Sequence, residues 1–177
     1  ISKKVGFPLE YTQGGGGNTS VKLDGQYMAV KASGCKLKDI TPMSGYVVVD
    51  YKKIKCYYEN VDLKEERDFE KESTDIAKQS VLQAPWLKPM RPSVEAGFHS
   101  VMKKYVIHTH AVYANILTCV ENGREIVEQI FKGKPYETVW IPYINPGFCL
   151  TLKIMESIND CVRCKGKAPE VFFMENH

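Results

Sequence analysis

The sequence predicts a single mixed α/β domain, and three observations support this fold class. The chain has 177 residues, of which 44% are hydrophobic and 25% charged, which is typical of one globular domain with a sizeable core. Short β-type runs alternate along the chain with segments whose apolar residues recur at helical spacing. No internal repeat and no Ser/Pro-rich linker interrupts the pattern. We therefore treat residues 1–177 as one domain.

The N-terminal third predicts three strands. Ser20–Leu23 and Tyr27–Lys31 flank Asp24-Gly25, a dipeptide that favours a tight hairpin turn, so these two strands should pair antiparallel. Tyr46–Val49 is the third strand. The following segment, Tyr51–Tyr58, has apolar residues at helical spacing but is rich in aromatic residues, and the pattern leaves helix and strand open.

The rest of the chain alternates helices with strands. Ser93 is a candidate N-cap for a helix that reaches Tyr105 and carries Glu95 in its first turn. Asn122-Gly123 is expected to stop a later helix. The other expected elements are a charged loop over 62–73 leading into a helix through Leu82, a strand Val106–Val112, a helix containing Ile116, Leu117 and Val120, a helix Leu150–Ile158 and a final strand Pro169–Met174.

Composition excludes several classes of partner. Twenty-four Lys and Arg against 21 Asp and Glu leave a formal charge of +3, too small for the basic stripe of a nucleic-acid-binding protein. The longest apolar runs are far shorter than the roughly 20 residues of a membrane span. Six scattered cysteines and no recognisable signal peptide favour a cytoplasmic protein. The chain begins with Ile1 and ends at His177 just after a strand, so we expect a protein cut at both ends.

His108-Thr109-His110 is the most informative short motif. Residues two apart on a strand share a face, so the two imidazoles could hold one cation; the alternative is two histidines on a half-exposed strand. A catalytic zinc site needs about three imidazole or carboxylate ligands, and His177, at a strand end, is the candidate third. Cys161 and Cys164 form a single CxxC, which is half of a four-thiolate zinc site or simply two incidental thiols.

Glu95 is the candidate proton-transfer group. A carboxylate beside a dication stays ionised and could move a proton on a metal-activated carbon acid. The alternative is an acidic residue placed only to complement the helix dipole.

Glycine and hydroxyl residues suggest an anion-binding pocket. The run Gly14–Gly17 could direct backbone N–H groups toward an anion, although a flexible loop is the alternative, and it matches neither a Walker A nor a dinucleotide motif. A second turn contains Ser33-Gly34, and Ser93 precedes Glu95. Three such elements predict a small phosphate pocket.

Five segments in this order resemble the class II aldolase/adducin family, and the likeness covers nearly the whole chain. The nearest resemblance is to aldolase-like domains that some bacterial proteins carry ahead of a short-chain dehydrogenase. The segments are Gly17–Ser20 (GNTS), Lys31–Gly34 (KASG), Pro92–Glu95 (PSVE), Ile107–Ala111 (IHTHA) and Glu175–His177 (ENH).

The resemblance implies a fold and a site. The fold is a three-layer α/β/α sandwich around a mainly antiparallel sheet, typically assembled as a homotetramer with active sites between subunits. The implied metal ligands are His108, His110 and His177, with zinc as the ion and another divalent metal as the alternative. Glu95 is the implied acid/base. The implied phosphate-binding residues are Asn18, Ser33, Gly34 and Ser93.

The implied function is a zinc-dependent aldolase that reversibly cleaves a ketose phosphate to dihydroxyacetone phosphate and an aldehyde through a metal-stabilised enediolate. The chain departs from the family's sugar-phosphate aldolases in having Ser93-Val94 where they have two serines, Ser33 where they commonly have Thr, and no Gly after His177. The alternatives are an epimerase, dehydratase or decarboxylase acting on a sugar phosphate, and, in another class, a non-catalytic adducin-head-like interaction module.

Overall fold

The computed structural model describes residues 1–177 and is built on a four-stranded antiparallel sheet. Its strands lie in the order β3-β2-β1-β4. The hairpin expected at Asp24-Gly25 joins β1 to β2, and the Asp24 carboxylate accepts hydrogen bonds of 2.7 Å from the backbone N–H groups of Gln26 and Tyr27. The strands are β1 (Asn18–Lys22), β2 (Tyr27–Lys31), β3 (Tyr46–Asp50) and β4 (Tyr105–His108).

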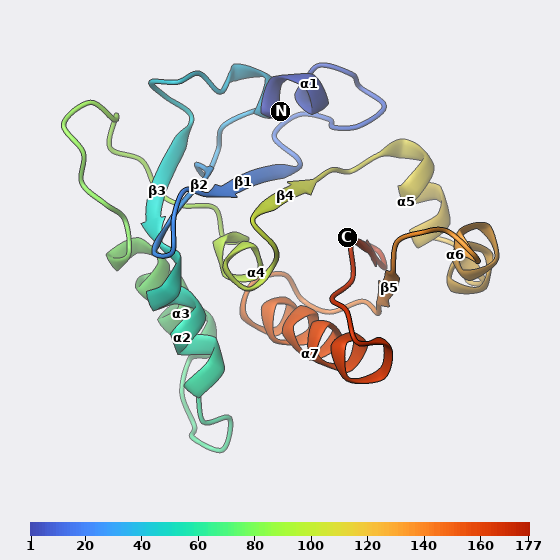
Figure 1. The fold of residues 1–177 in the computed structure, drawn as a ribbon. Coiled ribbons are helices and arrows are strands. Elements are labelled where there is room, and N and C mark those ends of the chain that lie inside the picture. Colours follow the sequence, from blue (N-terminus) through green and yellow to red (C-terminus); the bar gives the residue numbers. More distant parts are fainter.

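Four helices cover one face of this sheet and α1 lies on the other side, so the predicted mixed α/β fold with an antiparallel sheet is confirmed (Figure 1). Alternate residues of β2 and β3, such as Val30 and Val49, are buried against the helices, where Ile54, Ala96 and Phe148 meet them. The helices of this layer are α2 (Tyr51–Asn60), α3 (Phe69–Gln79), α4 (Ala96–Val101) and α7 (Phe148–Lys165).

A second, two-stranded parallel sheet completes the fold. Strand β5 pairs with β6, with Ile141 opposite Met174. Ile141 also packs against Phe98, Leu150 and Ile154 in a separate core cluster, which joins this sheet to α4 and α7. The remaining elements are α1 (Ser2–Gly6), the 3₁₀ helix η1 (Leu37–Asp39), α5 (Val112–Thr118), α6 (Gly123–Phe131), β5 (Thr138–Ile141) and β6 (Val171–Met174). No helix has both the length and the apolar character needed to cross a bilayer.

Several boundaries differ from the sequence expectations. The helix expected from Ser93 to Tyr105 begins only at Ala96, because the Ser93 hydroxyl accepts the Glu95 N–H in a turn before the helix. It ends at Val101, because Met102 has an extended backbone conformation. The ambiguous segment after β3 is helical, since the Asp50 carboxylate caps it by accepting the N–H of Lys53.

Gly123 begins α6 and does not simply stop a helix. A Cβ at this position would lie 1.8 Å from the carbonyl oxygen of Leu117, so glycine allows α6 to pack closely against the end of α5. The strand expected over Val106–Val112 ends at His108, and α5 begins at Val112.

Candidate metal centre and active site

Strand pairing places the first two site residues side by side. Asn18 is the first residue of β1 and His108 is the last of β4, and the antiparallel register sets them opposite each other. Both side chains are buried. Glu95 is the N-cap residue of α4, beneath this end of the sheet, and the Asn18 amide donates a hydrogen bond of 2.8 Å to Glu95 Oε2.

Three histidines converge at the same point. The ring centroid of His108 lies 5.0 Å from that of His110 and 4.9 Å from that of His177, and the last two are 5.6 Å apart. One ring nitrogen from each lies within 4.8 Å of the others. The convergence expected from the sequence is therefore present, but His110 lies beyond the end of β4, so strand alternation is not what brings it to His108.

The glycine run explains how His110 reaches this position. A Cβ on Gly16 would lie 2.9 Å from His110 Nδ1, and a Cβ on Gly17, whose φ is +72°, would lie 2.8 Å from the carbonyl oxygen of His108. The loop and the histidine segment could not approach so closely with larger residues. Gly16 and Gly17 thus form part of the wall of the histidine cluster.

A buried lysine fixes the other end of the glycine run. Lys31 is 5% exposed, and its ammonium group donates to the carbonyl oxygens of Gly15 at 3.3 Å and Cys35 at 2.9 Å. These bonds link the glycine run to the turn that contains Ser33 and Gly34. Burial lowers the pKa of Lys31, and the nearby carboxylate of Glu95 opposes that shift. The sequence analysis did not single out Lys31, because only the folded chain shows that it is buried.

The donor atoms of the cluster fit a divalent metal. Both ring nitrogens of His108 and Nε2 of His110 are buried without a hydrogen-bond partner. Glu95 Oε1 lies 3.2 Å from His108 Nδ1, but the angle is not that of a hydrogen bond. Burial lowers the pKa of His110 and so favours its neutral, ligating form. Three imidazoles match the three protein ligands that a catalytic zinc ion takes.

Glu95 remains ionised at the edge of this cluster. Burial alone would raise its pKa, but the imidazoles of His108 and His177 and the Asn18 amide more than offset burial and hold the pKa well below the ordinary value. Its Oε1 is 3.8 Å from His177 Nε2. An ionised carboxylate beside three unsatisfied imidazoles is suited to accept a proton from a carbon acid whose carbonyl is polarised at the cluster.

His99 lies immediately beneath the cluster and is completely buried. Its Nδ1 shares a hydrogen bond of 2.7 Å with the Ser20 hydroxyl, and its Nε2 has no partner. Burial lowers the pKa of His99 to about 3, so the ring is neutral. Ligand atoms of Glu95, His99 and His108 also lie within 4.8 Å of one another, which makes a second possible set of donors that shares His108 with the first.

The residues expected to bind phosphate fall into two groups. Ser33 and Ser93 line the same cavity of about 110 Å³, and Gly34 lies beside it with φ of +77° and open space around it. Asn18 does not line this cavity, since its amide is bound to Glu95. The two serines thus come together as expected, whereas Asn18 is placed to hold the carboxylate.

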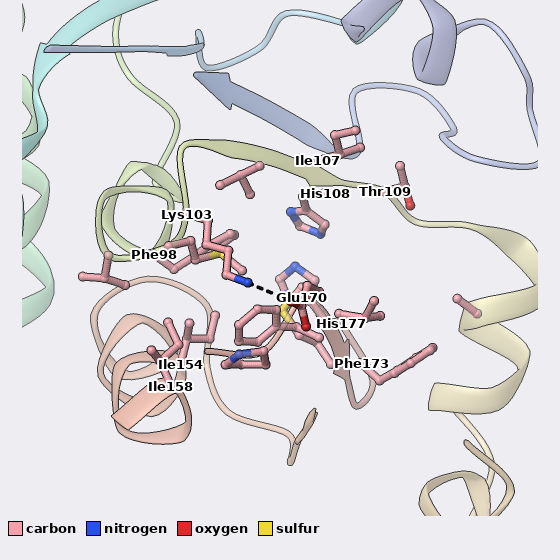
Figure 2. A pocket seen from close by; sticks show the side chains of 18 of the residues that line it. Phe98, Lys103, Ile107, His108, Thr109, Ile154, Ile158, Glu170, Phe173 and His177 are labelled. Carbon is pink, nitrogen blue, oxygen red and sulfur yellow. Dashed lines mark hydrogen bonds and ion pairs between the residues drawn. The ribbon is translucent and has the colours of Figure 1, made fainter. Parts of the chain in front are cut away.

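A larger cavity of about 570 Å³ opens on the other side of the cluster, between β4 and β6 (Figure 2). Figure 2 shows the imidazoles of His108 and His177 facing each other at its edge. Its wall is mostly apolar, with an ion pair of 3.1 Å between Lys103 and Glu170. None of the expected phosphate-binding residues lines it.

A sequence model of the class II aldolase and adducin N-terminal domain matches residues 4–177. The chain belongs to this family. It is similar to the uncharacterized oxidoreductase YuxG of Bacillus subtilis (strain 168), with 28% identity over 187 residues covering 99% of this chain and 24% of YuxG. The chain thus spans about a quarter of the length of that relative.

Solved structures of class II aldolase proteins share the fold. The N-terminal class II aldolase domain of a conserved protein from Thermoplasma acidophilum superposes with a TM-score of 0.75 at 24% identity, covering 99% of this chain and 77% of that one. YgbL from Klebsiella pneumoniae, whose candidate activities are aldolase, epimerase and decarboxylase, superposes with a TM-score of 0.58 at 16% identity, covering 99% of this chain and 71% of that one.

Proposed function

We propose that this class II aldolase-family domain is a zinc-dependent aldolase that reversibly cleaves a ketose phosphate into dihydroxyacetone phosphate and an aldehyde. The observation that carries the proposal is the ionised Glu95 carboxylate 3.2 Å from His108 and 3.8 Å from His177, at the edge of a cluster of three imidazoles with unsatisfied nitrogens. His108, His110 and His177 would hold the zinc ion, which would supply Lewis-acid polarisation of the substrate carbonyl.

Glu95 moves the proton in this scheme. In the condensation direction it accepts a proton from the hydroxymethyl carbon of dihydroxyacetone phosphate, and the C–H electron pair passes into the adjacent carbonyl group. In the cleavage direction it returns the proton to the same carbon. Asn18 keeps the carboxylate in place by holding Oε2, which leaves Oε1 directed at the histidine cluster.

Epimerisation, dehydration and decarboxylation of a sugar phosphate can use the same metal-assisted enediolate chemistry and are the alternatives. Analysis of products from a panel of ketose phosphates separates them. A non-catalytic interaction module does not need a buried carboxylate next to three imidazoles, and retention of all four residues favours an enzyme. The proposal includes assembly as a homotetramer, which light scattering coupled to size-exclusion chromatography tests.

The test is exchange of the hydroxymethyl proton of dihydroxyacetone phosphate with deuterium, measured on zinc-loaded protein. Glu95→Gln keeps the size of the side chain but removes its basic oxygen, so exchange should fall about 10²–10⁴-fold. Zinc content should stay near that of the wild type, because the three histidines remain. Glu128→Gln removes an exposed carboxylate paired with Arg124 and is the matched control. Equal exchange by zinc-replete wild type and Glu95→Gln would remove Glu95 from the reaction.

A further inference from the structure

The small cavity that contains Ser33 and Ser93 is also bordered by cationic side chains. Its volume of about 110 Å³ is the room that about three or four water molecules occupy. This space fits one small ionic group and not a whole sugar. Besides the two serines, the polar residues that line it are Tyr58, Ser73, Thr74, Lys78 and Arg91.

Arg91 is the unpaired charge of this cavity. Lys78 forms an ion pair of 3.0 Å with Asp75, whereas the guanidinium of Arg91 has no ion pair and no hydrogen bond. A guanidinium presents a planar fork of N–H donors that matches the oxygens of a phosphate group. The cavity therefore has a free cation but no anion from the chain to neutralise it.

The backbone holds Arg91 next to the serine turn. The N–H of Ser33 donates a hydrogen bond of 2.9 Å to the carbonyl oxygen of Arg91, and Ala32 and Pro92 form a β-bridge beside it. The backbone of Arg91 is therefore held in a fixed position between the Ser33 turn and Ser93. The hydroxyls of the two serines are neutral donors at the same cavity, which Tyr58, Ser73 and Thr74 also line.

Val94 cannot donate a hydrogen bond to an anion in this cavity, which leaves more of the binding to Arg91. Its side chain is 59% exposed at this cavity and offers no hydroxyl group. Of the two cationic side chains at the cavity, Lys78 is already paired with Asp75, so Arg91 is the one left free to pair with a dianionic group. The opposite charge of a guanidinium strengthens each hydrogen bond that it makes.

The cavity is also close enough to Glu95 for one small molecule to reach both. Ser93 and Glu95 are two residues apart, so their Cα atoms are at most about 7 Å apart. A three-carbon phosphate ester can place its phosphate beside Ser93 while its carbon chain lies at the carboxylate.

We propose that Arg91 binds the phosphate group of the substrate and makes the site selective for phosphorylated over neutral ketoses. This inference rests on the proposed function for the identity of the substrate, but the binding of phosphate itself does not depend on catalysis. Arg91 is a specificity residue, since it contacts the part of the substrate that does not react.

The first experiment measures inorganic phosphate binding to the zinc-free protein, followed by the backbone amide NMR signals of Ser33 and Ser93. Arg91→Gln should weaken binding about 10–100-fold, the effect of losing a charge-assisted hydrogen bond. Arg91→Lys should recover part of the affinity because it restores the charge without the fork. Arg124→Gln, which removes an exposed arginine paired with Glu128, is the matched control and should bind as the wild type does.

The second experiment measures proton exchange of dihydroxyacetone phosphate by the zinc-loaded variants. Arg91→Gln should raise KM about 10–100-fold and leave kcat within about threefold, because the lost contact is made equally in the ground and transition states. Wild-type affinity for inorganic phosphate in Arg91→Gln, or no shift of the Ser33 and Ser93 signals in the wild type, would overturn the inference. Arg91-dependent phosphate binding in a protein without exchange activity would instead refute the proposed function and leave this inference standing.

Discussion

The buried His99 should make the protein sensitive to mild acid. Its pKa is about 3 in the folded chain because burial penalises the charged ring, against 6.5 for an exposed imidazole. Between these values the unfolded chain binds a proton on this residue that the folded chain does not, so the free energy of unfolding falls as pH decreases below 6.5. At pH 5.0 the unfolded chain is 1.5 pH units below its pKa, which at 1.36 kcal/mol per unit is a loss of about 2 kcal/mol relative to pH 7.5.

The assay is urea unfolding at pH 7.5 and pH 5.0 in the presence of a chelator, for the wild type and His99→Asn. The asparagine amide can take over the hydrogen bond of 2.7 Å to the Ser20 hydroxyl but does not titrate. All other ionisable groups are the same in the two proteins, so their contributions cancel in the comparison. The wild type should lose about 2 kcal/mol more than the variant over this interval. Parallel losses in the two proteins would refute the assignment of His99 as a buried neutral imidazole.

Two further substitutions test how the site is supported. Gly16→Ala places a Cβ 2.9 Å from His110 Nδ1 and should lower zinc affinity about tenfold by displacing this ligand, as measured by competition with a chromogenic chelator, whereas Gly15→Ala has open space and should bind zinc normally. Lys22→Met should lower the free energy of unfolding by about 1–3 kcal/mol, because the Lys22 ammonium donates to the carbonyl oxygens of His99, Met102 and Lys103 at the end of α4. Lys134→Met, at an exposed position, is the control in urea unfolding, and equal midpoints for the two variants would contradict the second prediction.

Features set by local chemistry could be predicted from the sequence. The Asp24-Gly25 hairpin follows from turn preferences within a few residues, and the structure forms it with two backbone N–H bonds to the Asp24 carboxylate. The β-type runs Tyr27–Lys31 and Tyr46–Val49 likewise predict the strands that the structure forms as β2 and β3. Neither cysteine of the CxxC motif belongs to a group of three potential metal ligands, and Cys161 is buried whereas Cys164 is exposed.

Features that depend on distant parts of the chain could not be predicted from local patterns. His110 joins the cluster because Gly16 and Gly17, more than 90 residues earlier, allow a close approach. His177 reaches the cluster because β6, which precedes it, pairs with β5, and the paired residues are about 30 positions apart in the sequence. That Arg91 lacks an acidic partner is visible only once the surroundings of Ser33 are folded.

The central claim is that His108, His110 and His177 hold one metal ion beside Glu95, and zinc binding tests it most directly. X-ray absorption of the zinc-loaded protein should show imidazole nitrogens at about 2.0–2.1 Å and no sulfur at about 2.3 Å. Zinc content should be one ion per chain, and His110→Ala and His177→Ala should each lose affinity by more than the 10–100-fold typical of outer-shell partners. Sulfur ligands would place the metal at Cys161 and Cys164. Full zinc retention in both histidine variants would place it on Glu95, His99 and His108, and either result would contradict the account.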